Sequence, residues 1–172
     1  MKQIKNLTLA SMFLALGILF PQIFHAIPNA GNMILPMHIP VILCGFICGP
    51  LYGLLVGLLT PILSNLIFSM PAIAMLGQMI VELGTYGLMC GILYKVINVK
   101  NSLIKNYIVL ILSMIIGRLV YGICNALIFK TGNYNFDMWI KVALIIAIPG
   151  ILIQLFLIPI LVIKIQEIKN KY

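Results

Sequence analysis

The chain has 172 residues, of which 63% are hydrophobic and 8% charged, with a formal net charge of +8 at pH 7. Soluble domains carry about 25% charged residues, and a chain of this size has too little interior to bury so much apolar surface. These values exclude a soluble globular domain and predict a single membrane domain over residues 1–172. The positive charge does not indicate nucleic-acid binding, because the lysines cluster at the ends of apolar segments.

The first apolar segment covers residues 7–25. It resembles a secretory signal, but no A-x-A site follows, so we expect it to remain as a helix. A loop containing Pro28, Asn29, Gly31 and Asn32 comes next. The apolar segment after this loop, residues 37–49, is shorter than the roughly 20 residues that one crossing needs.

Glycine recurs at every fourth position of VILCGFICGPLYGLLVG, residues 41–57, and Pro50 interrupts the series. Proline cannot continue a helix but suits the first turn of a new one. One continuous helix over 37–69 would be about 50 Å long, which is too long for one crossing. The sequence therefore predicts two helices joined at Pro50, with small-residue faces where backbones approach closely.

The four cysteines, Cys44, Cys48, Cys90 and Cys124, all lie within apolar runs. No Cys/His group has zinc-site spacing, and no third ligand lies near the first two cysteines. Cysteine in such surroundings packs as a small hydrophobe. We expect no metal, no cofactor and no redox site.

The remaining helices are predicted over residues 50–69, 72–96, 104–129 and 140–166, with a break at Ser69–Pro71. The prediction is an all-α membrane protein with six transmembrane helices, the second of them short.

Six crossings place both termini on one side of the membrane. That side would carry eight lysines and the opposite side two, Lys130 and Lys141. Cytoplasmic segments are enriched in lysine, so we expect both termini to be cytoplasmic in a multi-pass protein of the cell membrane.

Glu82 and Arg118 are the only charged residues deep inside the apolar segments. Each lies about 15 Å from the outer end of its helix, so the two share a depth. An isolated charge at that depth is costly, and each therefore needs a partner. Two interpretations stay open: an ion pair that fixes helix packing, or contact with a polar ligand.

Helical spacing places Gln78, Glu82 and Tyr86 on one face of 72–96, and Arg118, Tyr121 and Asn125 on one face of 104–129. Two polar stripes at similar depth predict a lined cavity. The inner half is nearly all aliphatic, so the site would open outward. Other candidate substrate-binding residues in the outer half are Asn29, Asn32, His38, Asn65 and, after a kink expected at Pro149–Gly150, Gln154. Asn and Gln can instead be interhelical hydrogen-bonding groups worth about 0.6 kcal/mol each.

Catalytic motifs are missing from the sequence. It contains no HExxH, no GxSxG, no paired carboxylates and no Walker A sequence. We expect no catalytic residues and no ATP hydrolysis by this chain. A continuous polar row for ion conduction is also missing, which favours capture of a molecule over a channel.

Two segments, LPMHIPVILCGFICGPLYGLLVGLLTPILSNLIFSMP (35–71) and VELGTYGLMCGILY (81–94), carry a family resemblance. They resemble the second to fourth helices of the substrate-binding S component of energy-coupling factor (ECF) vitamin transporters, and the likeness extends over about residues 7–167. It implies an outward-facing vitamin site with the first loop as a lid. It also implies a transmembrane T component and two ATPase subunits as partners. By position, the substrate contacts of the family would fall on Asn29, Asn32, Gln78, Glu82, Arg118, Tyr121, Asn125 and Gln154.

S components dock through small residues of the first helix, usually AxxxA. This chain has Ser11 and Ala15 at that spacing, and serine is small enough to substitute. These two residues could alternatively pack within the bundle.

The identity of the ligand depends on Arg118. Its guanidinium could hold a carboxylate through two hydrogen bonds, which favours an acidic vitamin such as pantothenate or folate. That argument fails if Glu82 already neutralises Arg118. Cobalamin, pyridoxine or a queuosine-type ligand are equally allowed, and the alternative function is a small structural or assembly subunit without a ligand.

Overall fold

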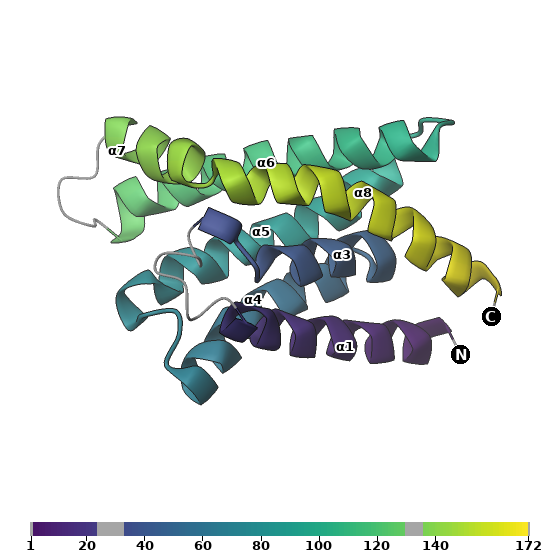
Figure 1. Cartoon of the computed structure of the whole chain (residues 1–172), viewed down its shortest axis with the longest axis horizontal. Coiled ribbons are helices and arrows are strands. Elements are labelled where there is room, and N and C mark those ends of the chain that lie inside the picture. Colours follow the sequence, from purple (N-terminus) through teal and green to yellow (C-terminus); the bar gives the residue numbers. More distant parts are fainter. Residues whose placement is uncertain (1, 24–32, 130–135, 172) are drawn as a thin grey trace.

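The computed structural model describes residues 2–23, 33–129 and 136–171, which form a bundle of helices (Figure 1). The elements are α1 (Lys2–Ile23), α3 (His38–Cys48), α4 (Pro50–Phe68), α5 (Ile73–Val96), α6 (Ser102–Cys124), the π-helix η1 (Asn125–Phe129), α7 (Phe136–Ile140), the π-helix η2 (Lys141–Ile146) and α8 (Ile148–Lys171).

The predicted all-α fold with six helices is confirmed. Among the described residues, five helices are long and apolar enough to cross a membrane, and α3 is a shorter apolar helix. The helix expected over 104–129 is α6 continued by η1. The last one begins earlier than expected, at Phe136, as α7, η2 and α8 follow one another. The two termini lie at the same end of the bundle (Figure 1).

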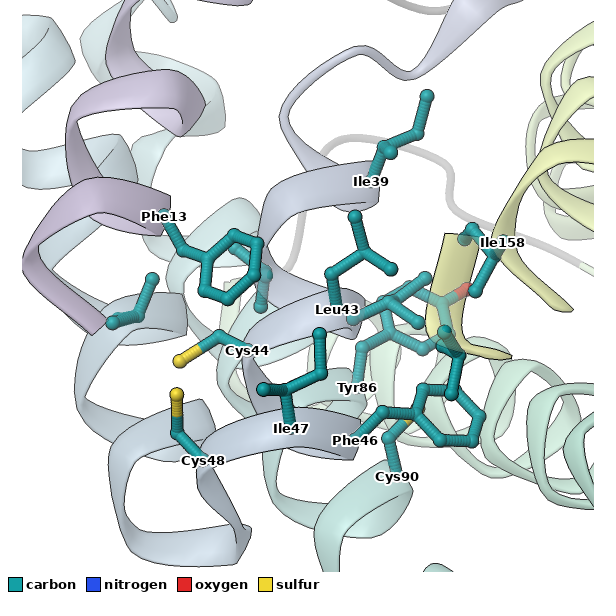
Figure 2. Close-up of a cluster of buried hydrophobic side chains, with 14 of the residues drawn as sticks. Phe13, Ile39, Leu43, Cys44, Phe46, Ile47, Cys48, Tyr86, Cys90 and Ile158 are labelled. Carbon is teal, nitrogen blue, oxygen red and sulfur yellow. The ribbon is translucent and has the colours of Figure 1, made fainter. Parts of the chain in front are cut away.

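Helix α3 is the centre of the core. All 11 of its residues are buried. Figure 2 shows its side chains between Phe13 of α1, Tyr86 of α5 and Ile158 of α8. A helix of this length spans only about 16 Å, too little for a bilayer. Because protein surrounds it on all sides, its ends do not need to reach the membrane surface.

The joint between α3 and α4 lies where the proline predicted it. Helix α3 ends at Cys48 and α4 begins at Pro50, with Gly49 between them at φ 98°. Side chains rarely adopt this φ, so the position favours glycine. Cys44 and Cys48 are buried cysteines on the same side of α3 as Phe13 (Figure 2).

Helices α4 and α5 touch through their backbones. A Cβ on Gly53 would collide with the Gly87 carbonyl, and a Cβ on Gly87 would collide with the Gly53 carbonyl. One turn away, Gly57 lies equally close to the carbonyl of Leu83. Lipid offers no hydrophobic drive between helices, so close contact of small residues supplies the attraction.

We expect Gly87→Ala to destabilise the protein by about 1–3 kcal/mol, because the added methyl would meet backbone that cannot move aside. Thermal unfolding of the purified protein in detergent measures this loss. Gly84→Ala on the same helix is the matched control, since its Cβ would meet Leu58 Cδ2 at 2.9 Å, the end of a flexible side chain. Equal unfolding midpoints for Gly87→Ala and wild type would contradict the close backbone contact.

Candidate functional site

Glu82 on α5 and Arg118 on α6 form an ion pair in the interior. Arg118 Nη1 lies 2.9 Å from Glu82 Oε1. Only 7% of Arg118 and 4% of Glu82 is exposed. Each charge therefore has the partner that its depth in an apolar helix requires.

His38 approaches the same carboxylate from α3. Its Nε2 lies 3.6 Å from Glu82 Oε1, and its ring meets the Tyr86 ring edge-on with centroids 5.3 Å apart. His38 is the first residue of α3, and its N–H donates to the carbonyl of Leu35 at 3.1 Å. The start of the short helix thus delivers a third ionisable side chain to the pair.

The Tyr86 ring fits beside this cluster because α6 has glycine opposite it. A Cβ on Gly117 would lie 2.5 Å from Tyr86 Cε1. Tyr86 itself is 1% exposed. Residue 117 therefore has to be small for α5 and α6 to close around the ion pair.

A second set of contacts surrounds the pair on α6. The Tyr121 hydroxyl donates to Gln78 Oε1 at 3.4 Å, so the two predicted polar stripes meet. Asn125 Nδ2 donates to the Tyr121 carbonyl at 2.8 Å. Helix α6 widens into η1 from Asn125, and π-helical turns occur frequently at functional sites.

Trp139 on α7 also reaches this region, which the sequence did not predict. Its indole Nε1 donates to the backbone carbonyl of Arg118 at 3.1 Å. The same ring lies over Gly122, which shares a helical face with Arg118. The sequence did offer two signals, a single tryptophan and a glycine on the face of α6 that carries Arg118. Spacing along the chain could not show that these two residues meet.

Several polar atoms of this cluster are buried without a hydrogen bond to any described residue. They are His38 Nδ1, Nε and Nη2 of Arg118, and Asn125 Oδ1. Each such atom costs about 1–3 kcal/mol, and native interiors keep few of them. The two arginine donors among them make the surroundings of the ion pair a candidate binding site.

The structure places the other predicted site residues differently. Asn65 donates from Nδ2 to the Pro71 carbonyl at 2.7 Å, so its amide holds the turn after α4. Gln154 is 1% exposed on α8. Asn29 and Asn32, with the expected lid loop, lie outside the described residues.

Ser11 and Ala15 are exposed on the outer face of α1. The Ser11 hydroxyl donates back to the Leu7 carbonyl of the same helix at 3.0 Å. The opposite face of α1 carries the buried Ala10 and Phe13. The alternative that Ser11 and Ala15 pack within the bundle is therefore wrong, because the inward side of the helix is a different one.

Among protein families, the chain matches the substrate-specific component of ECF transporters over residues 5–166. The chain belongs to this family. Comparisons with curated proteins and with solved structures found no match. As an S component, the protein is the substrate-binding subunit of a transporter, and membership implies a small-molecule substrate together with T-component and ATPase partners. The ion-pair cluster lies within the matched region.

We expect Glu82→Gln to destabilise this S component by about 3–5 kcal/mol, because Arg118 would be left as an uncompensated buried charge. The double variant Glu82→Gln/Arg118→Gln should recover part of the loss. Denaturation in detergent measures both. Lys105→Gln, which removes a charge that lies over the Tyr94 ring, is the control and should cost less than 1 kcal/mol. An unchanged stability of Glu82→Gln would show that the pair does not hold the helices together.

Proposed function

We propose that this S component captures a water-soluble vitamin or related micronutrient at the outer face of the cell membrane. Together with a T component and two ATPase subunits, it delivers that molecule to the cytoplasm. The observation that carries the proposal is the two buried donors of Arg118, Nε and Nη2, that no described residue satisfies. Polar atoms of a bound molecule would satisfy them.

The binding group on the substrate follows from which atoms of Arg118 are engaged. Glu82 contacts Nη1, so it neutralises the arginine, and charge alone no longer favours an acidic vitamin. The nitrogens without partners among the described residues, Nε and Nη2, lie on one edge of the guanidinium and point their hydrogens in parallel. Such an edge binds two adjacent acceptor atoms. A carboxylate fits it, as does the adjacent ring nitrogen and carbonyl of a heterocycle.

Two features support a site that faces outward. The termini lie at one end of the bundle, and eight lysines were assigned to that end, which favours a cytoplasmic location. Helix α7, which carries Trp139, lies at the opposite end (Figure 1). The contact between Trp139 and the Arg118 carbonyl therefore links the cluster to the outer end.

The exposed face of α1 supports docking on the T component. Ser11 and Ala15 lie one turn apart on this face, and small side chains let another helix approach closely. Neither residue contributes to the cluster around Glu82, so docking and substrate capture use separate surfaces.

A structural or assembly subunit is the second candidate. The ion pair favours it, since opposite charges between α5 and α6 would fix helix packing by themselves. It would, however, leave Nε and Nη2 of Arg118 unsatisfied by any described residue. Ligand binding separates the two functions.

We expect the purified protein to bind one member of a panel of pantothenate, folate, pyridoxine, cobalamin and queuosine with micromolar or tighter affinity. Arg118→Lys should weaken that binding at least tenfold, or about 1.4 kcal/mol, because lysine keeps the charge but loses the two parallel donors. Calorimetry measures both affinities.

Tyr94→Phe is the matched control for Arg118→Lys. It removes the hydrogen bond between the Tyr94 hydroxyl and Gln166, which joins α5 to α8 away from the cluster. Its affinity should equal that of wild type. Failure of every compound in the panel to bind would favour the structural subunit.

We expect Ala15→Leu to impair uptake by the assembled transporter without changing substrate affinity, because a larger side chain prevents close docking on the exposed face of α1. Uptake in reconstituted vesicles and binding by the isolated chain measure the two effects. Ser11→Ala keeps this face small and should leave both unchanged. Normal uptake by Ala15→Leu would place the docking surface elsewhere.

A further inference from the structure

Trp139 is the only tryptophan of the chain, and its indole is built into the face of α6 that carries Arg118. Nε1 donates to the Arg118 carbonyl at 3.1 Å. One turn along, a Cβ on Gly122 would lie 2.5 Å from Nε1 and 2.7 Å from Cδ1 of the ring. Because residue 122 is a glycine, there is room for the indole ring against α6, and the hydrogen bond to the Arg118 carbonyl fixes the orientation of the ring.

The Arg118 carbonyl is already part of the hydrogen-bonding of α6, in which each carbonyl accepts from the residue four positions on. A carbonyl oxygen has two lone pairs, so the indole occupies the second. The bond consequently links α7 to the backbone of the one arginine that meets Glu82, rather than to any polar side chain.

The helices on both sides of this contact depart from α geometry. Helix α6 becomes η1 at Asn125, three residues after Gly122, and α7 becomes η2 at Lys141, two residues after Trp139. The N–H of Asn125 is shared between the carbonyls of Tyr121 and Gly122. Widened turns of this kind are common where a helix accommodates a function. The indole ring thus lies near two points where an α-helix changes to a π-helix.

We infer that Trp139 is a positioning residue for Arg118. By tying α7 to the carbonyl at 118, it fixes the part of α6 from which the guanidinium extends, so that Nη1 meets Glu82 while Nε and Nη2 stay available for substrate. The inference rests on the proposed function. It has a spectroscopic consequence: substrate bound to Arg118 changes the surroundings of the only indole in the chain.

A double-mutant cycle between Trp139→Phe and Arg118→Lys tests this role. Phenylalanine keeps an aromatic ring but loses the N–H donor. With the member of the vitamin panel that wild type binds, Trp139→Phe should weaken affinity about threefold to tenfold, the range expected for one hydrogen bond. In the Arg118→Lys background it should weaken affinity less than about twofold, since residues that act through one another are not additive.

Intrinsic fluorescence gives an independent readout of the same coupling. The emission of wild type should change on addition of that vitamin, and Arg118→Lys at saturating vitamin should change less. Gly122→Ala, which displaces the ring while leaving the indole N–H in the chain, should weaken binding at least as much as Trp139→Phe. If Trp139→Phe does not fold, the affinity of Gly122→Ala and the change in wild-type emission test the inference instead.

Gly17→Ala is the matched control for Gly122→Ala. Its added methyl would meet Thr60 Cγ2 at 2.8 Å, between α1 and α4, so it should lower the unfolding midpoint and leave affinity unchanged.

Equal losses of affinity from Trp139→Phe in the wild-type and Arg118→Lys backgrounds would show a purely structural role and overturn the inference. Wild-type binding with unchanged affinity in both Trp139→Phe and Gly122→Ala would also overturn it, with the proposed function intact. If wild type binds no member of the panel, the proposed function fails and the inference with it.

Discussion

Glu82 and Arg118 carry opposite charges inside apolar helices, where either charge without the other would strongly destabilise the protein. Their contact fixes how α5 and α6 lie along one another, and it brings Gln78 within reach of Tyr121. Because the Glu82 carboxylate contacts Nη1, the other two nitrogens of the guanidinium, Nε and Nη2, are left without a partner among the described residues. One interaction thus joins two helices and leaves two donors of the same guanidinium without a hydrogen bond to a described residue.

The pair depends in turn on close backbone packing elsewhere. Gly53 and Gly87 bring α4 against α5, and Gly117 lets the Tyr86 ring lie against α6. Because α3 is short and enclosed, its first residue, His38, lies inside the protein instead of at a membrane surface. The glycines therefore let the neighbouring helices pack closely, and the short α3 places its first residue beside the carboxylate of α5.

Polar groups in this protein fall into two kinds. The Asn65 amide donates to the Pro71 carbonyl, and the Tyr94 hydroxyl pairs with Gln166; such contacts join segments of the fold. Nε and Nη2 of Arg118 are more deeply buried and lack hydrogen-bond partners among the described residues. In a family of substrate-binding subunits, this difference is the basis for proposing Arg118 as a substrate-binding residue.

The sequence by itself determined the helices, the break at Pro50 and the two intramembrane charges, because apolar runs, proline and isolated charges are local signals. Only the tertiary structure decided which groups meet. It paired Asn65 with a turn, placed Ser11 and Ala15 on an outward face, and brought Trp139 to the Arg118 carbonyl. Such contacts depend on the rotation and separation of helices distant in the chain, which spacing along a single helix does not contain.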